Sequence, residues 1–183
     1  AAKAYTDYTK LLDAREVDLV MVLTPASTHR AIVEAVAARG IHVFCEKPLA
    51  VTLEESKSIV ESCKRANVKL FYGSCYRYLP AIVKAKQLIQ SGAIGKVQLM
   101  TEQLIGGHGT KGYTELSPIH YPFGGPGGSG MGLVDHGIHL IDIFPWISDS
   151  EIVTAQGQGH LSGEAPSSEF MVMHLANGAI GHL

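Results

Sequence analysis

The stretch that decides the fold is Ile41-His42-Val43-Phe44-Cys45-Glu46-Lys47-Pro48, a short apolar run that ends at a glutamate, a lysine and a proline. We expect the apolar part to form a buried strand of a parallel sheet. Proline fixes its own φ and biases the preceding residue toward extended backbone, so Lys47 becomes a positioned ammonium group. It lies at the edge where open parallel sheets bind ligands. For a Lys-Pro pair alone, the alternative is a solvated lysine in a turn.

Two similar apolar runs flank this stretch, at residues 17–23 and 68–73. Segments with helical spacing separate the three runs, one through residues 31–38 and one over 53–66. Thr52 can open the second helix with a capping box. Three strands that alternate with two helices form a parallel, right-handed βαβαβ unit.

The sequence changes character after residue 73 and predicts an α+β arrangement with a mainly antiparallel, open sheet. The intervening segment 106–132 is rich in glycine and long enough to be a binding loop. Asn177-Gly178 is a strong hairpin signal. Because the chain begins without Met and stops inside a strand pattern, we expect it to be cut at both ends. Helical spacing is found over 79–91 and 133–146, and alternation typical of strands over 96–105, 152–155, 170–175 and 179–183.

The composition is typical of a packed protein whose partners are small molecules or other protein chains. Of 183 residues, 46% are hydrophobic, and the formal net charge is -2. This charge gives no electrostatic reason to expect nucleic acid or a membrane as a partner. The three cysteines lack Cys-x-x-Cys spacing, which argues against a disulfide framework or a cysteine-based zinc site and favours the cytoplasm. No apolar run approaches the ~18 residues that span a membrane.

The second informative stretch is Asp135-His136-Gly137-Ile138-His139-Leu140-Ile141-Asp142. On a helix, Asp135 and His139 share a face, with Asp142 one turn farther along, while His136 points elsewhere. A carboxylate and an imidazole on one face make an acid and base pair suited to proton transfer near neutral pH. A capping aspartate with a structural histidine is one alternative. A metal site ranks lowest, because one helix face supplies at most three ligands, so we expect no metal.

Other polar residues lie where the predicted parallel strands end. Thr24-Pro25 and His29 follow the first strand, and Tyr76-Arg77 follows the third. With Lys47 they mark one edge of the sheet, the edge at which α/β proteins bind a cofactor or substrate. Taken alone, each of these residues is more often an ordinary loop residue than one that binds a ligand. Their common placement at the strand ends is therefore the informative observation.

Two further features carry no predicted chemistry. The segment Gly125-Pro126-Gly127-Gly128-Ser129-Gly130 matches G-x-G-x-x-G. A dinucleotide loop should follow a buried strand, and residues 117–123 have two prolines and no strand pattern, so we reject this interpretation. Cys45 lies close to Lys47 in the sequence, but no histidine follows it as a partner, and we interpret it as a small core residue.

Together these motifs resemble the Gfo/Idh/MocA family of NAD(P)-dependent sugar and cyclitol oxidoreductases. The resemblance covers almost the whole chain, and its specific part is Glu-Lys-Pro followed later by Asp-x-Gly-x-His. The matching residues, in the family's order, are Val17-Asp18-Leu19-Val20, Thr24-Pro25 with His29, Glu46-Lys47-Pro48-Leu49-Ala50, Tyr76-Arg77, Gly92-Ala93-Ile94-Gly95 and Gly132-Leu133-Val134-Asp135-x-Gly137-x-His139-x-x-Asp142.

The resemblance implies an α/β protein with two domains. Residues 1–75 would be the C-terminal part of a Rossmann domain that binds NAD or NADP. Residues 76–183 would be the first part of a substrate-binding α/β domain, whose open sheet commonly forms a homo-oligomer interface. The implied reaction is hydride transfer between NAD(P) and a secondary alcohol carbon of a small sugar or cyclitol.

The resemblance also implies roles for single residues. Lys47 would hydrogen-bond the reacting hydroxyl, His139 would be the general base that takes its proton, and Asp135 would orient the substrate or His139. Lys47 and His139 should then face one cavity, and the Lys47–Pro48 peptide bond is expected to be cis, an isomer accessible before proline. Tyr76 and Arg77 would lie near the substrate. The cofactor would be lined by Thr24, Pro25, His29, Glu46, Lys47 and Pro48.

The chain departs from the family pattern at its beginning. The first strand, the glycine loop and the residue that selects NAD or NADP have no counterpart here, and we expect them to precede Ala1. The helix N-terminus that donates N–H groups to the pyrophosphate is then missing. We therefore expect the 183-residue chain to be inactive by itself and to bind NAD weakly or not at all, which calorimetry can test.

Two other functions stay open. A hydrolase of the same fold could use a retained NAD to oxidise a glycoside transiently, and it would release sugar without a net change in NADH absorbance. A non-catalytic binding or regulatory module is the other, because a fold does not fix a function. In that case Lys47→Ala and His139→Ala would leave the activity of the full-length parent unchanged.

Overall fold

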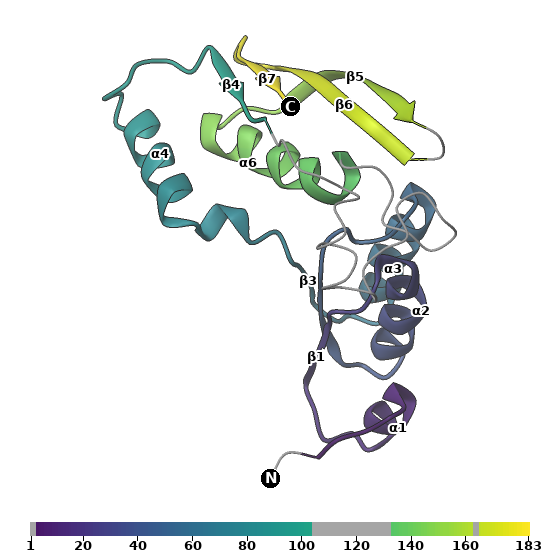
Figure 1. Ribbon diagram of the computed structural model, residues 1–183. Helices are drawn as coiled ribbons and strands as arrows, with labels where there is room; N and C mark the ends of the chain where they lie inside the picture. The colour runs from purple at the N-terminus through teal and green to yellow at the C-terminus, as the bar shows by residue number, and fades with distance from the viewer. Residues whose placement is uncertain (1–2, 104–132, 163–164) are drawn as a thin grey trace. The chain divides into compact units, whose positions relative to one another are not determined.

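The computed structural model describes residues 3–103, 133–162 and 165–183. Within them the chain forms two compact units, the first of which ends at Gly73 and the second of which begins at Ser74. Figure 1 shows the elements of both units in chain order.

In its described part, the first unit is a three-stranded sheet with its helices. The strand order is β1-β2-β3 and both pairs are parallel, with Met21 opposite Phe44 and Phe44 opposite Phe71. The predicted βαβαβ unit is confirmed, although each strand is shorter than the apolar run that predicted it. The elements are α1 (Tyr8–Asp13), β1 (Leu19–Val22), α2 (Ala26–Ala37), β2 (His42–Cys45), α3 (Leu53–Arg65) and β3 (Leu70–Tyr72).

The core of the first unit lies between the sheet and helices α2 and α3. Fully buried side chains come from both layers, for example Val43 of β2, Val36 of α2 and Ile59 of α3. Both helices lie on the same side of the sheet (Figure 1). Strand side chains alternate between the two faces, and those turned away from the helices are more exposed, with Met21 at 56% and Phe71 at 47%.

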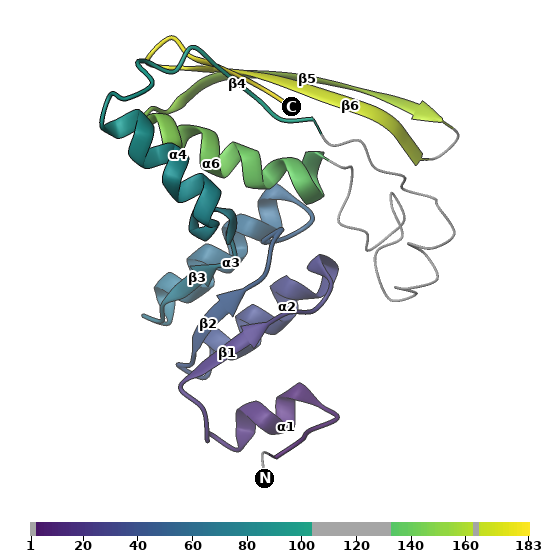
Figure 2. The same cartoon turned by 60° about the vertical axis from the view of Figure 1, so that its left-hand side comes forward.

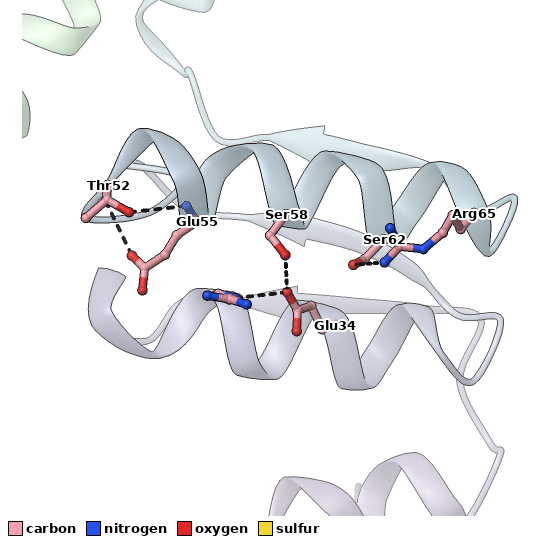
Figure 3. Close-up of polar contacts among 7 residues, drawn as sticks. Glu34, Thr52, Glu55, Ser58, Ser62 and Arg65 are labelled. Carbon is pink, nitrogen blue, oxygen red and sulfur yellow. Dashed lines mark hydrogen bonds and ion pairs between the residues drawn. The ribbon is translucent and has the colours of Figure 1, made fainter.

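Helices α2 and α3 are linked by the polar contact drawn in Figure 3. Ser58 of α3 donates its hydroxyl to a Glu34 carboxylate oxygen at 2.7 Å, and Arg30 donates to the same oxygen at 3.0 Å. The bond from Ser58 holds the pKa of Glu34 below its ordinary value, although burial opposes it. The predicted capping box of α3 is confirmed, because the Thr52 hydroxyl accepts from the Glu55 N–H and the Glu55 carboxylate accepts from the Thr52 N–H.

The described part of the second unit is a four-stranded sheet packed on helices. In the order β4-β7-β6-β5, the β4–β7 pair is parallel and the other pairs are antiparallel, so the expected mainly antiparallel sheet is confirmed. Figure 2 shows α6 lying along one face of this sheet. Phe144 of α6 and Met173 of β6 are buried in the core of the unit. The elements are η1 (Tyr76–Tyr78), α4 (Pro80–Gln90), β4 (Leu99–Thr101), η2 (Leu133–Gly137), α6 (Ile138–Ser148), β5 (Ile152–Ser162), β6 (Ala165–Leu175) and β7 (Ile180–His182).

Two features of the second unit differ from the prediction. Strands β5 and β6 are each 11 residues long and extend beyond the predicted runs. The prediction was too short because apolar alternation covers only part of each strand. The helix expected from Leu133 begins instead as a π-helix over Leu133–Gly137 and becomes α-helical at Ile138. Single π turns inside helices occur frequently at functional sites.

Candidate functional site

The first part of the candidate site lies at the carboxyl ends of β1, β2 and β3. The backbone N–H of Glu46 donates to the Val22 carbonyl at 3.0 Å, and that of Gly73 donates to the Cys45 carbonyl at 2.8 Å. Lys47 follows directly and is half-buried. Its peptide bond to the next residue is cis, as predicted. The sheet therefore fixes the backbone on the amino side of the lysine.

Gly73 is required for the packing of Glu46. A Cβ atom at position 73 would lie 2.5 Å from Glu46 Oε2 and 3.1 Å from the Cys45 carbonyl oxygen. Both distances are shorter than ordinary van der Waals contact, so any larger residue would push the carboxylate away from the end of β3. Glu46, which was predicted to line the cofactor, thus depends on Gly73 for its position. The sequence pattern indicated Gly73 only as the end of a strand.

His29 is buried inside the first unit. Its side chain is 0% exposed, Nδ1 lies 3.0 Å from the Pro48 carbonyl oxygen, and Nε2 lies 2.7 Å from the Thr24 carbonyl oxygen. The Leu49 carbonyl oxygen is 3.3 Å from Nδ1. The ring therefore joins the end of β1 to the loop that carries Lys47. Any effect of this histidine on a cofactor would act through the backbone that it holds.

Thr24 and Pro25 lie where β1 ends and α2 begins. Thr24 is exposed, and Pro25 is half-buried as the N-cap residue of α2. The hydroxyl groups of Thr24 and Thr28 are 2.7 Å apart, which ties the strand end to the first turn of the helix. An exposed threonine and a lysine at neighbouring strand ends form the kind of edge at which parallel sheets bind ligands.

Cys45 is a core residue, as predicted. Its side chain is 0% exposed. Burial, with a smaller contribution from the charge of Glu46, raises the pKa of the Cys45 thiol to about 12. A thiol with this pKa stays protonated at neutral pH, and the thiolate is the reactive form. The cysteine beside Lys47 is therefore no candidate nucleophile.

The second part of the candidate site is built on η1, η2 and α6. His139 lies in the first turn of α6 and is 5% exposed. Its ring stacks on Tyr76 of η1, with the ring centroids 3.8 Å apart and an interplanar angle of 4°. Two residues that were both predicted to act on the substrate, and that are far apart in the sequence, are therefore in direct contact.

Asp142, one turn after His139 on α6, binds both Arg77 and Ser74. Arg77 donates from Nε to Oδ2 at 2.7 Å and from Nη2 to Oδ1, and the Ser74 hydroxyl donates to Oδ2 at 2.6 Å. Burial by itself would raise the pKa of Asp142. The hydrogen bonds from Arg77 and Ser74 and the nearby positive charges outweigh burial and hold that pKa below its ordinary value. The bond to Asp142 raises the pKa of Arg77.

The structure adds a pair that the sequence did not indicate. His136 Nε2 lies 3.1 Å from a Glu102 carboxylate oxygen. The His136 ring meets Tyr76 and His139 edge-on, at centroid distances of 6.1 and 6.0 Å. The expectation that His136 points elsewhere is wrong, because its ring lies in the same cluster as Tyr76 and His139. His136 precedes His139 by three residues, a spacing that places side chains on one face of a helix, so the sequence did carry this signal.

Other parts of the predicted site cannot be placed in the same way. The side chain of Asp135 and the glycine-rich segment 106–132, with its G-x-G-x-x-G match, lie outside the described residues. Lys47 belongs to the first unit and His139 to the second, so their common cavity stays a prediction. Over the described ranges, no group of three or more His, Cys, Asp and Glu residues could hold a metal ion. No helix within these ranges is long and apolar enough to cross a membrane.

Comparisons with known proteins agree with this arrangement. Residues 1–74 match a family model described as "Oxidoreductase family, NAD-binding Rossmann fold", and residues 82–183 match the GFO/IDH/MocA C-terminal domain. The rhizopine catabolism protein MocA of Rhizobium meliloti is 30% identical over 149 residues, which cover 81% of this chain and 44% of the relative. The myo-inositol 2-dehydrogenase of Thermotoga maritima is 29% identical over 187 residues, with coverages of 98% and 52%. The chain thus spans about half the length of the curated relatives it matches.

A solved structure has the same fold. The crystal structure of myo-inositol 2-dehydrogenase from Lactobacillus plantarum superimposes with a TM-score of 0.81 at 24% identity, and the match covers 98% of this chain and 53% of that chain. At this level of identity the likeness shows the fold alone. It agrees with a parallel α/β unit followed by a mixed sheet packed on helices.

Proposed function

Because the chain belongs to the Gfo/Idh/MocA family, we propose that the protein that carries it is an NAD(P)-dependent dehydrogenase of sugars or cyclitols. The reaction would oxidise a secondary alcohol carbon to a carbonyl. The stack of buried His139 on Tyr76 is the observation that supports this proposal, because an imidazole held in one orientation is a suitable proton acceptor near neutral pH. The inositol dehydrogenase among the relatives supports the substrate class.

The carboxyl-terminal edge of the first sheet fits a nicotinamide cofactor. Thr24 is exposed there, Lys47 supplies a positive charge, and Gly73 lets the Glu46 carboxylate lie against the backbone. When bound, NAD(P) supplies the acceptor for the hydride that leaves the alcohol carbon. His29 would contribute by holding this backbone in place. The residues proposed to line the cofactor are Thr24, Pro25, Glu46 and Lys47, and Pro48, whose side chain is buried, would contribute through its backbone.

His139 is the proposed general base. As the hydride leaves the carbon, the O–H proton must leave the oxygen so that a neutral carbonyl forms. A ring nitrogen of His139 would take this proton, and the π face of Tyr76 would stabilise the imidazolium that results. Lys47 would hydrogen-bond the same oxygen and stabilise the negative charge that develops on it. Asp135 would orient the substrate or His139.

Tyr76 and Arg77 are proposed to contribute to the substrate site. Tyr76 lies directly against His139, so a hydroxyl group that reaches the imidazole also comes close to this tyrosine. The Arg77 side chain is 39% exposed, although two of its donors bind Asp142. A guanidinium has five N–H donors, so others remain for the hydroxyl groups of a polyol.

Activity measurements on the protein that carries this sequence test the proposal. Formation of NADH or NADPH is followed by absorbance with a panel of inositols and aldoses. Lys47→Ala and His139→Ala are each expected to lower kcat by ~10²–10⁴-fold, since each removes a group that acts on the reacting hydroxyl. Lys57→Ala is the matched control, because Lys57 is an exposed lysine on α3 and should leave kcat unchanged.

The other functions predict different results. Full activity of both variants would contradict the proposed roles and favour a non-catalytic module. Release of sugar from a glycoside without net NADH would favour the NAD-dependent hydrolase, which none of the relatives named above suggests.

We also propose that the protein forms a homo-oligomer through the outer face of the second sheet. Side chains alternate along β6, so that Met173 packs on α6 while its neighbours turn outward. The outer positions of the described β4, β6 and β7 hold no Lys, Arg, Asp or Glu, and depletion of charge is typical of interface cores. These positions are Leu99, Thr101, Phe170, Val172, His174, Ile180 and His182.

A further inference from the structure

Tyr76 lies between two residues that bind one carboxylate. Ser74, two residues earlier, donates its hydroxyl to Asp142 Oδ2 at 2.6 Å. Arg77, the next residue, binds both oxygens of the same carboxylate. The backbone on either side of Tyr76 is therefore attached to a single point on α6, and the tyrosine cannot shift along the helix without breaking a contact.

The anchor and the stacked ring lie on the same helix. Asp142 follows His139 by three residues on α6, so the two side chains point to the same side. Asp142 fixes the backbone of Tyr76, and His139 receives the Tyr76 ring. The geometry of the stack is therefore set by the regular spacing of one helix.

The stack sets the ring of His139 against the face of the Tyr76 ring. Here the rings are parallel within 4° and their centroids are 3.8 Å apart. A cation over an aromatic face is attracted by the quadrupole of the ring. Holding Tyr76 in this position therefore favours the imidazolium form of His139 over the neutral form.

We propose that Asp142 is a positioning residue, which uses Ser74 and Arg77 to hold Tyr76 against His139 and so stabilises the protonated imidazole. The effect on catalysis rests on the proposed function of His139 as general base. The claim that Asp142 holds Tyr76 against His139 does not rest on it. Asp142 acts mainly through position, because the guanidinium of Arg77 neutralises most of its charge. The positive charge of His139 nevertheless contributes to the lowered pKa of Asp142, which agrees with their closeness on the helix.

NMR of the His139 ring protons tests the structural part in the protein that carries this sequence. The face of Tyr76 shifts these protons upfield, and Asp142→Asn should move them back toward ordinary positions because the amide cannot accept both guanidinium donors. The imidazole should then take up its proton at a lower pH than in the wild type. Asp149→Asn is the matched control, because Asp149 caps the other end of α6 and should leave the ring signals unchanged.

Kinetics test the catalytic part. Asp142→Asn should lower kcat by about 10- to 100-fold, and the acidic limb of the pH profile should move to lower pH. If Asp142 acts through Tyr76, adding Asp142→Asn to a Tyr76→Leu variant should cost almost nothing more. Additive losses, or His139 signals that stay at their wild-type positions in Asp142→Asn, would overturn the proposal.

Two further measurements keep the test decisive. Should Asp142→Asn fail to fold, Ser74→Ala removes a single hydrogen bond and should shift the His139 signals in the same direction by a smaller amount. Unshifted signals in that variant would also overturn the proposal. If the wild-type protein forms no NADH with any substrate, the proposed function fails, and the NMR shifts still decide whether Asp142 positions Tyr76.

Discussion

At the scale of single residues, His29 joins the end of β1 to the loop that follows Lys47. Its ring bridges the carbonyl of Thr24, at the end of β1, and that of Pro48, in the loop after Lys47. Buried backbone carbonyls that lose a donor cost free energy, because no water replaces the lost bond. The position of the Lys47 loop therefore depends on a histidine that never needs to meet a substrate.

Replacing His29 by Leu is expected to lower the free energy of unfolding by about 1–3 kcal/mol, because a carbonyl is left without its donor. Urea denaturation followed by circular dichroism measures this loss. Ser27→Ala, at an exposed position in the first turn of the same helix, should stay within about 0.5 kcal/mol of the wild type. A His29→Leu protein as stable as the wild type would show that these contacts contribute nothing.

Single residues could be predicted from the sequence only where a motif constrains them. Lys47 was predicted from the strand and the proline around it, and its strand-end position is confirmed. His29 was predicted to line the cofactor, but spacing along a helix does not tell which face is buried, and the ring lies in the interior. The partners of Asp142 come from another segment of the chain, and no local pattern indicates them.

At the scale of elements, α3 is defined by its first turn. Thr52→Ala removes the hydroxyl that accepts from the Glu55 N–H, and we expect it to cost about 1 kcal/mol of stability. Thermal denaturation of the two proteins measures the difference. Thr52→Ser keeps the hydroxyl and should recover most of the loss, so equal losses in the two variants would contradict a capping role.

The π-helix before His139 shows why some elements could not be predicted from the sequence. A π turn over Leu133–Gly137 adds a residue to one turn without disturbing the apolar spacing of α6 that follows. Periodicity detects the helix but not the extra residue. The π turn belongs to the site, because His136 within it meets the His139 ring edge-on.

At the scale of the whole molecule, the order of elements was the most predictable property. Alternation of strands and helices leaves few topologies, and the parallel order β1-β2-β3 is the expected one. The Asn177-Gly178 signal correctly placed the β6–β7 hairpin. The parallel pairing of β4 with β7 was not predicted, since two strands far apart in the sequence share no turn that would specify it.

Self-association through the outer sheet face can be tested by adding charge to it. Phe170 and Ile180 are 44% and 36% exposed on that face. Phe170→Lys and Ile180→Lys should convert an oligomer of the protein that carries this sequence into monomers, because a buried unpaired charge costs several kcal/mol. Size-exclusion chromatography with light scattering gives the mass. Leu53→Lys, at a leucine 62% exposed on α3, is the control, and an equal effect there would contradict this interface.

The step from Gly73 to Ser74 separates two sets of bonds within a single peptide unit. Gly73 is hydrogen-bonded to the Cys45 carbonyl in the first unit, and Ser74 is hydrogen-bonded to Asp142 in the second unit. Consecutive Cα atoms are about 3.8 Å apart, so no unbonded linker residue separates the two sets of bonds at this step. A residue inserted there would have neither of these partners.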